Sequence, residues 1–347
     1  MFSFFKKLCK HKETKDNRLI CNEAFDTVTV QADGTITCGC GDIYEGRSLG
    51  NVNNSSLSEI FNNDKYRQLR KGLLDCDFLP QCASCPVRVR ERKGDESVDG
   101  NSIICLQVEP FFGCNLRCPD CALTKMKVEK CLVRPQTALT LETFCSLVDQ
   151  TAKTLKHIRF HLLGEPFVNK DAGKMLAYAK NIIPDVFISI ETNGLLLDES
   201  LRKTLIDSRV DYIKFSIDGA SQETYGQYRV GGDFEKAYAN MSDLIKERDE
   251  RGADRPRVLW QYILFTWNDS DEEIKKAQQL AKEANVDELY WLTTHSSGTS
   301  TKYLPNKSYA IFQGERQSFN TTIEIAGKNG EPLTRPAPNL ESYDPWK

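Results

Sequence analysis

The chain has 347 residues, with 46 lysines and arginines against 49 aspartates and glutamates, and a formal net charge of -3. This length allows a core domain of about 200 residues with a smaller unit beside it. The near balance of charge gives no general attraction to nucleic acid or to an anionic membrane. No apolar run approaches the roughly 18 to 20 residues that span a bilayer. We therefore expect a cytoplasmic protein without a membrane span or a nucleic-acid partner.

The first 18 residues are predicted to form a tail. The opening MFSFFKKLCKHKETK has too short an apolar segment and too many lysines for a secretory signal. Its mixture of phenylalanine and lysine leaves docking to a membrane surface as an alternative.

Thirteen cysteines in a chain without an export signal favour metal ligation over disulfides, because the cytosol keeps thiols reduced. Most of them gather in the first quarter of the chain and in one short segment near residue 118. Four lie apart, namely Cys9, Cys105, Cys131 and Cys145. Cys145 falls on the apolar face of a predicted helix, where a packed thiol is the expected role.

After the tail, the sequence predicts a small cysteine-rich module. CNEAFDTVTVQADGTITCGC reads as two strands around an Asp33-Gly34 turn, and this hairpin would bring Cys21 near Cys38. A helical pattern follows in SLSEIFNNDKYRQLRKGLLDC, and then Cys82 and Cys85 form a CxxC motif that can clamp a metal centre. This pattern by itself fits a four-cysteine zinc site as well as an iron–sulfur cluster.

Beyond a charged linker, strand and helix patterns alternate along most of the remaining chain. The strand candidates are IICLQVEP, IRFHLLGEP, VFISIETNG, YIKFSIDG, VLWQYILF and DELYWLTT, and the helical candidates between them are LTLETFCSLVDQTAKT, KDAGKMLAYAKN, DESLRKTLIDSR, DFEKAYANMSDLIKERDERG and SDEEIKKAQQLAKEA. This order predicts parallel strands and an α/β fold. About six units suit an open, partial (β/α)6 barrel better than a closed eight-fold one.

The predicted organisation has five parts: a tail (1–18), the cysteine-rich module (19–88), a linker (89–102), the partial barrel (103–296) and a C-terminal extension (297–347) that forms either a lid or an irregular tail.

Unusual residues follow the predicted strands at their carboxyl ends, where α/β sheets and barrels bind ligands. In chain order they are the loop with Cys114, Cys118 and Cys121, then Gly164-Glu165-Pro166, then Thr192-Asn193-Gly194, then Ser216 with Asp218. Each motif alone fits a turn or a helix cap. Four of them in register at one rim indicate a ligand site.

These motifs resemble the radical S-adenosylmethionine (SAM) superfamily over roughly residues 101 to 296. The resemblance rests on CxxxCxxC after the first strand, GEP after the second, TNG after the third and FSIDGASQETYGQYRVGG from the fourth onward. It implies that three thiolates hold a [4Fe-4S] cluster whose fourth ligand is SAM. Reductive cleavage of SAM then yields a 5′-deoxyadenosyl radical that abstracts hydrogen from a substrate C–H bond.

The resemblance also implies residue roles. Cys114, Cys118 and Cys121 would be the cluster ligands, and Gly164, Glu165 and Pro166 would receive the SAM amino group. Thr192, Asn193, Ser216 and Arg229 would line the methionyl carboxylate and the ribose, with Arg229 as the natural carboxylate partner because its guanidinium can pair two oxygens.

The cysteine-rich module resembles the SPASM-type auxiliary cluster module, although that module usually follows the barrel and here precedes it. The resemblance implies one auxiliary [4Fe-4S] cluster held by Cys21, Cys38, Cys82 and Cys85, with Cys40 or Cys76 as substitutes. Four protein ligands would make it an electron conduit or a structural clip.

The substrate is less constrained. The chain offers no room for a leader-binding domain beside the cysteine-rich module, which favours a small polar molecule over a peptide. Residues on or after the last two strands suit a polyhydroxylated ligand, namely Gln261, Trp267, Asn268, Trp291 and His295. Oxidation or epimerisation would follow hydrogen abstraction, with Cys131 as candidate hydrogen donor, and a reductase, flavodoxin or ferredoxin would supply electrons. The alternatives are a peptide or protein maturase and a non-catalytic zinc or iron–sulfur interaction protein.

Overall fold

The computed structural model describes residues 19–20, 23–39, 48–74, 89–90, 99–100, 102–129, 134, 136–292, 294 and 297–302. The predicted tail, most of the linker and nearly all of the C-terminal extension lie outside these residues. So do the cysteines at positions 9, 21, 40, 76, 82, 85 and 131 and the histidine at position 295.

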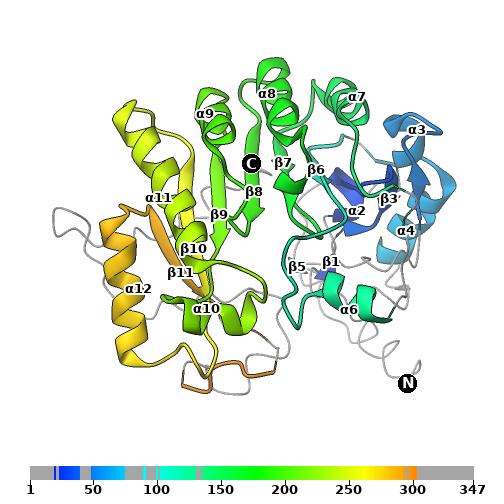
Figure 1. Cartoon of the computed structure of the whole chain (residues 1–347). Helices are drawn as coiled ribbons and strands as arrows, with labels where there is room; N and C mark the ends of the chain where they lie inside the picture. Colours follow the sequence, from blue (N-terminus) through cyan, green and yellow to red (C-terminus); the bar gives the residue numbers. More distant parts are fainter. Residues whose placement is uncertain are drawn as a thin grey trace.

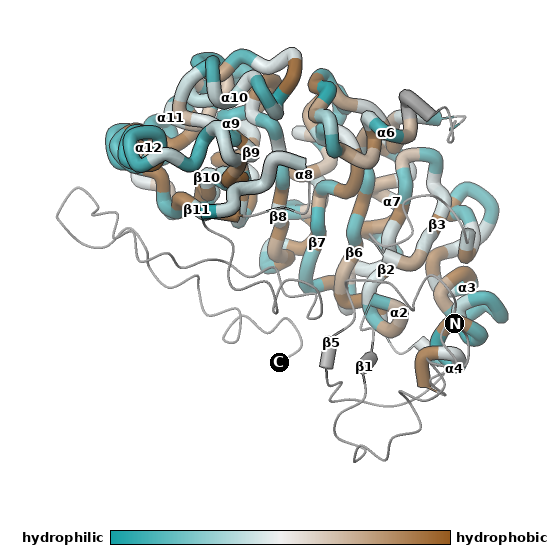
Figure 2. The backbone as a smooth tube through the Cα atoms, turned by 90° about the horizontal axis from the view of Figure 1, so that it is seen from below, coloured by the Kyte–Doolittle hydropathy of each residue, from teal (hydrophilic) through white to brown (hydrophobic). Residues whose placement is uncertain are grey.

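Six parallel strands form the predicted partial barrel. They are β6 (Cys105–Val108), β7 (His157–Arg159), β8 (Phe187–Thr192), β9 (Tyr212–Ser216), β10 (Arg257–Ile263) and β11 (Glu288–Leu292), and they pair in chain order. All five pairings are parallel, and the sheet curves without closing on itself (Figures 1 and 2). The prediction of an open α/β barrel is confirmed.

The five predicted helices form between these strands. They are α7 (Leu141–Thr151), α8 (Ala172–Ile182), α9 (Glu199–Asp207), α11 (Phe234–Glu250) and α12 (Asp271–Glu283). Asp198 and Ser270 cap α9 and α12, since their side chains accept the backbone N–H three residues on. None of the described helices is both long and apolar enough to cross a membrane.

Three further helical segments were not predicted. They are α6 (Ala122–Glu129), the short 3-10 helix η3 (Pro166–Val168) and α10 (Gln222–Tyr228). Each follows one of the rim motifs, and α6 and α10 lie on the same side of the molecule in Figure 1, away from α7, α8 and α9. Their short lengths and weak apolar periodicity explain why the sequence pattern did not identify them.

Alternate residues along the barrel strands supply the core. Leu106, Ile158, Ile188, Ile213 and Val258 are completely buried, and they belong to one hydrophobic cluster with apolar residues of the covering helices. Their neighbours in sequence point to the opposite, inner face of the sheet, because successive strand side chains alternate. The hydrophobic core therefore lies between the outer face of the sheet and the helices. The inner face of the sheet does not pack against these helices.

The cysteine-rich module contributes strands to the same sheet. β2 (Thr27–Val30) and β3 (Thr35–Thr37) form the predicted hairpin, and Gly34 adopts a φ of +82° in its turn. β4 (Gly50–Asn51) pairs with β3, while β2 pairs in parallel with β6, which extends the sheet to nine strands. The sequence did not predict this pairing, because it joins residues far apart in the chain.

The remaining described elements of the N-terminal part pack beside the hairpin. They are α2 (Glu23–Asp26), α3 (Leu57–Phe61), α4 (Asp64–Leu74) and the small ladder of β1 (Leu19–Ile20) with β5 (Val89–Arg90). The predicted helical stretch is thus two helices. Its apolar residues share one hydrophobic cluster with the barrel, so the two parts have a common core. The boundaries proposed for the module and the linker stay predictions.

A buried ion pair fastens the hairpin turn to the segment after β6. The carboxylate of Glu109 pairs with Arg134, and both side chains are inaccessible to solvent. Glu109 Oε2 also accepts the N–H of Ala32 at 3.1 Å, and the Gln136 amide donates to the Ala32 carbonyl at 3.1 Å. The Arg134 guanidinium lies 3.9 Å from the ring centre of Phe112. The N-terminal hairpin is therefore anchored directly against the loop that carries the clustered cysteines.

Candidate functional site

The loop after β6 presents three thiols on one turn. Cys118 is buried, and Cys114 and Cys121 are half-buried. The N–H of Leu116 donates to Cys114 Sγ at 3.3 Å, and the N–H of Cys121 donates to the Cys118 carbonyl at 3.2 Å. These bonds fold the loop back on itself before α6 begins.

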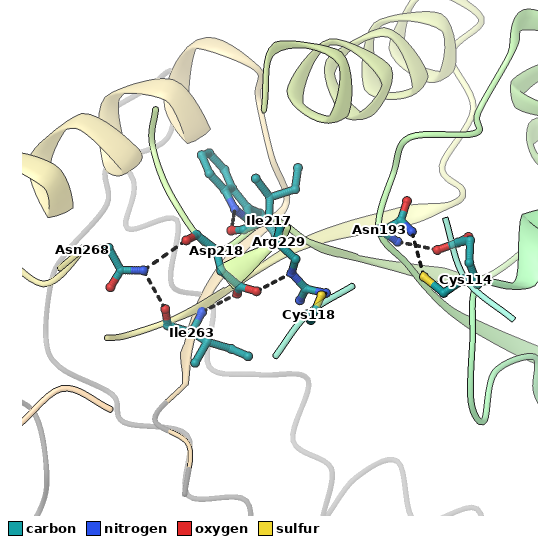
Figure 3. Close-up of polar contacts among 10 residues, drawn as sticks. Cys114, Cys118, Asn193, Ile217, Asp218, Arg229, Ile263 and Asn268 are labelled. Atoms are coloured by element: carbon teal, nitrogen blue, oxygen red, sulfur yellow. Dashed lines mark hydrogen bonds and ion pairs between the residues drawn. The ribbon is translucent and has the colours of Figure 1, made fainter. Parts of the chain in front are cut away.

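Two of these sulfurs receive N–H donors from other rim motifs. Asn193 Nδ2 lies 3.7 Å from Cys114 Sγ and 2.7 Å from Asn115 Oδ1, and Arg229 Nη1 lies 3.8 Å from Cys118 Sγ (Figure 3). N–H donors stabilise a thiolate and tune the potential of a cluster that it binds. The structure thus brings the predicted cysteine loop, the TNG motif and Arg229 together.

The buried side chain of Glu165 connects the GEP motif to the TNG motif. Its carboxylate accepts the Asn193 N–H at 2.7 Å, the Thr192 hydroxyl at 2.7 Å and the Phe167 N–H at 3.3 Å. Only 2% of the residue is exposed. Glu165 therefore positions Thr192 and Asn193. That the GEP stretch, with this carboxylate, receives the SAM amino group stays a prediction.

The burial of Glu165 predicts a pH dependence of stability. Burial raises the pKa of Glu165 from 4.5 to about 7, against the opposing effect of its bonds to Asn193 and Thr192. Because the folded pKa lies above the unfolded one, the stabilising contribution is present below about pH 4.5 and is lost as the pH rises through about 7. We expect the free energy of unfolding of the wild type, relative to Glu165→Gln, to fall by about 3 kcal/mol between pH ~5 and ~8 in urea titrations. A pH-independent difference would contradict this origin.

Gly164 brings the GEP turn against the cysteine loop. Its φ is +83°, and a Cβ at this position would lie 2.4 Å from the carbonyl oxygens of both Phe111 and Gly113. The N–H of Glu165 donates to that same Gly113 carbonyl at 2.8 Å. Glycine is therefore required both by the backbone conformation and by the close approach of two loops.

Gly164→Ala is expected to displace the cysteine loop and to reduce iron incorporation after reconstitution. Gly231→Ala is the matched control, because Gly231 has a similar φ of +87° and a Cβ added there would meet nothing within 4 Å. In the control, the left-handed backbone conformation alone should lower the free energy of unfolding by about 1 kcal/mol. In Gly164→Ala, the steric overlap of the new Cβ with the two carbonyl oxygens should lower it by about 2 kcal/mol more. Urea titrations and iron analysis of both variants measure the difference, and equal effects would rule out the close contact as the cause.

Arg229 is held in place by a buried carboxylate. Its Nε donates to Asp218 Oδ2 at 2.6 Å, and Asp218 Oδ1 accepts the Ile263 N–H at 2.7 Å (Figure 3). Asn268 Nδ2 donates to the Asp218 carbonyl at 3.1 Å and to the Ile263 carbonyl at 3.0 Å. Asp218 is completely buried and raises the pKa of the Arg229 guanidinium. The arginine is therefore a fixed cation that connects the ends of β9 and β10 to the cysteine loop.

Sequence reasoning missed Asn115 as a partner of Asn193, and it did not give Asp218 and Asn268 their orienting roles. The signal for Asp218 was present, because the aspartate directly follows β9 in the SIDG segment. Ser216 ends β9, is half-buried, and has no side-chain hydrogen bond within the described part of the chain. Cys145, expected to be packed, is only half-buried on α7. The predicted donor at position 131 lies outside the described residues.

A cavity of about 360 Å³ opens at the other edge of the sheet, between the ends of α8 and α9. Its lining residues, which include Lys180 and Arg209, precede strands β8 and β9 and so lie at the amino ends of the strands. The rim motifs are at the carboxyl ends. This cavity is therefore separate from the candidate site.

The donor set of the cysteine loop fits an iron–sulfur cluster. Among the described residues, no three His, Cys, Asp or Glu side chains form a group that could hold a single metal ion. Three thiols on one loop would suit a cluster in which each thiolate binds a different iron. Burial raises the pKa of Cys118 to about 11, so the thiol keeps its proton until metal binding displaces it.

The sequence matches the family model of the radical SAM superfamily over residues 108–295, more than half of the chain. The chain belongs to the radical SAM superfamily. A second model, an iron–sulfur cluster-binding domain called SPASM, matches residues 21–86 and precedes the barrel. The two domains imply a SAM-binding [4Fe-4S] cluster and an auxiliary iron–sulfur cluster in this radical SAM protein, as predicted.

Curated relatives of this radical SAM protein act on different substrates. The AdoMet-dependent heme synthase of Methanosarcina barkeri is 30% identical over 49% of this chain and 45% of its own length. The PqqA peptide cyclase of Granulibacter bethesdensis is 29% identical over 47% of this chain and 40% of its own. The chain thus spans less than half the length of these relatives. A structure of Streptococcus suis SuiB bound to its precursor peptide SuiA aligns over 68% of this chain and 54% of that one, with 13% identity and a TM-score of 0.43.

The expected preference for a small-molecule substrate over a peptide is wrong. A relative named as a peptide cyclase shares the radical SAM segment, and it matches this chain at nearly the same identity as the heme synthase. The argument from missing room for a leader-binding domain therefore does not separate the two substrate classes. Radical SAM proteins are enzymes, but the relatives do not support the specific choice of oxidation or epimerisation.

Proposed function

We propose that this protein is a radical SAM maturase that modifies a peptide or protein. Cys114, Cys118 and Cys121 hold the SAM-binding cluster in this proposal. The observation that carries it is that the Asn193 and Arg229 donors reach two thiols of the cysteine loop, at 3.7 Å from Cys114 Sγ and 3.8 Å from Cys118 Sγ. A reduced [4Fe-4S] cluster with bound SAM supplies a 5′-deoxyadenosyl radical that removes hydrogen from a C–H bond.

The protein's own groups orient SAM. Arg229 pairs the methionyl carboxylate, because Asp218 fixes its guanidinium beside Cys118 with a 2.6 Å bond to Nε. Thr192 and Asn193, held by Glu165, and Ser216 at the end of β9 line the same rim. The main chain at Gly164 and Pro166 receives the amino group. Together these groups would hold SAM in one orientation at the carboxyl ends of the strands.

The auxiliary cluster would lie next to the barrel in this proposal. Its ligands would be Cys21, Cys38, Cys82 and Cys85. Cys38 is half-buried directly after β3 and packs against the shared core, so a cluster there would sit on an element of the barrel sheet. A cluster held there would supply electron-transfer chemistry beside the barrel.

The peptide class rests on the SPASM match and on the relative named as a peptide cyclase. The test is hydrogen abstraction from extracts of the native host grown in deuterated medium. The reconstituted protein is incubated with SAM, a reductant and extract fractions, and deuterium in 5′-deoxyadenosine is measured by mass spectrometry. We expect deuterium transfer from the peptide and protein fraction, and its loss after that fraction is digested with a nonspecific protease. Transfer from the small-molecule fraction instead would overturn the proposal.

A further inference from the structure

The inner face of the barrel carries polar residues in register, and the functions described so far leave them unused. Along β8 and β9 the pairing sets Glu191 opposite Lys214 and Ser189 opposite Tyr212. Hydrophilic and hydrophobic residues alternate along β7 and β8 in Figure 2, as expected when one face packs on helices and the other does not. Glu191 and Lys214 lie two residues before Asn193 and Ser216, which places them about 7 Å below the rim.

The charged side chains on this face form ion pairs. Lys214 Nζ lies 2.6 Å from Glu191 Oε1, and Arg257 pairs with Glu288. Arg159 Nη1 lies 2.8 Å from the carboxylate of Glu23, which α2 of the cysteine-rich module supplies. Each of these three cations therefore lies beside a carboxylate.

Two histidines lie beside these ion pairs. His161 Nε2 lies 3.4 Å from Glu191 Oε1. His157 bonds to the Ser189 hydroxyl at 2.9 Å, and burial lowers its pKa to about 3, so this imidazole is neutral. About a third of the Glu191 side chain is exposed. Solvent can therefore reach the Glu191–Lys214 pair.

Neutral amides on the same face have hydrogen-bonding capacity to spare. Gln261 pairs with Ser216 in the β-ladder and is 7% exposed, and its side chain has no hydrogen bond to any other described residue. Gln107 is 5% exposed, and its Oε1 is buried without a hydrogen-bond partner among the described residues. A buried amide oxygen without a hydrogen-bond donor lowers the free energy of unfolding unless a ligand donates to it.

Resting on the proposed function, we infer that the inner face selects a peptide segment with an uncharged, hydrogen-bonding side chain at the position that is modified. The amides of Gln261 and Gln107 bond that side chain and its main chain. A lysine or aspartate side chain is disfavoured, because it would compete with Lys214 or with Glu191 for its partner in the 2.6 Å ion pair.

The inference is tested with defined peptides. The probes are acetylated and amidated Gly-Gly-Gly-Xaa-Gly-Gly-Gly with serine, asparagine, lysine or aspartate at Xaa. Their dissociation constants for the reconstituted full chain with SAM are measured by saturation-transfer NMR. We expect the wild type to bind the serine and asparagine probes about tenfold more tightly than the charged ones. Equal binding of all four probes would overturn the inference.

Charge changes in the pair sharpen the test. Lys214→Met removes the lysine partner of Glu191 and should tighten binding of the lysine probe about tenfold. Glu191→Gln removes the carboxylate partner of Lys214 and should tighten binding of the aspartate probe about tenfold. Lys246→Met is the matched control, because Lys246 lies on the exposed face of α11 with 71% of its side chain accessible. If both variants kept the wild-type preference for uncharged over charged probes, the inference would be wrong.

Two further variants guard against misfolding and separate this inference from the proposed function. The double variant Glu191→Gln/Lys214→Gln keeps the face neutral and should bind the serine and asparagine probes as the wild type does. Gln261→Leu should weaken binding of the serine and asparagine probes about tenfold and leave the affinity for SAM unchanged. A wild type that binds none of the probes overturns the inference alone. The proposed function fails separately, if deuterium transfer from the host extract survives protease treatment.

Discussion

Replacing Cys118 with alanine should abolish the formation of 5′-deoxyadenosine from SAM. Cys118 is the most buried of the three loop thiols and the one that contacts Arg229. A cluster cannot compensate for a missing ligand when the site offers three thiolates. Even changes outside the ligand shell typically cost 10- to 100-fold in metal sites, so we expect a loss of at least about 100-fold in anaerobic, reduced assays.

The matched control for this variant is Cys145→Ala, because Cys145 is a half-buried thiol on α7 and away from the rim. It should retain wild-type iron content and wild-type 5′-deoxyadenosine formation. Iron content of the Cys118 variant should fall as the SAM-binding cluster is lost, while the auxiliary cluster remains. Full activity in Cys118→Ala would mean that the cysteine loop does not hold the cluster.

Replacing Arg229 with alanine should both destabilise the protein and abolish SAM binding. The change leaves Asp218, which is completely buried, as a carboxylate without a cation. Removing one partner of a buried ion pair costs about 3 to 5 kcal/mol. Urea titrations measure this loss, and equilibrium dialysis with the reconstituted protein measures the affinity for SAM.

Two substitutions separate the structural effect from the binding effect. Arg229→Lys keeps a cation beside Asp218 and should recover most of the stability, but it loses the planar fork and should bind SAM more weakly. Arg209→Ala removes an exposed arginine whose ion pair with Asp254 has both side chains more than 60% accessible, and it should change neither quantity. SAM affinity retained in Arg229→Ala would exclude the proposed carboxylate contact.

The N-terminal position of the SPASM domain has a structural consequence. Its hairpin lies beside the first barrel strand, with Val28 opposite Leu106 in the parallel pairing. Glu109 and Arg134 then lock the hairpin turn onto the cysteine loop. A domain placed before the barrel thus reaches the first strand directly. Cys38 lies at the end of this hairpin and packs against the shared core.

The sequence alone determined the barrel, because the evidence for it is local. Six runs of apolar and β-branched residues alternate with five amphipathic segments, and this strand–helix order specifies parallel strands. The same locality identified the rim motifs, since a residue that follows a parallel strand must lie at its carboxyl edge. The caps at Asp198 and Ser270 were likewise readable from neighbouring residues.

Only the tertiary structure decided how distant segments meet. The pairing of β2 with β6 and the buried Glu109–Arg134 pair join residues with no local signal for each other. The bonds of the buried Glu165 carboxylate to Thr192, Asn193 and Phe167 likewise had no signal in the neighbouring sequence. The ion pair between Glu191 and Lys214 on the inner face also depends on strand register, which sets the two residues side by side. Side-chain period fixes which face a residue occupies, but its partner across the sheet is set by register and packing.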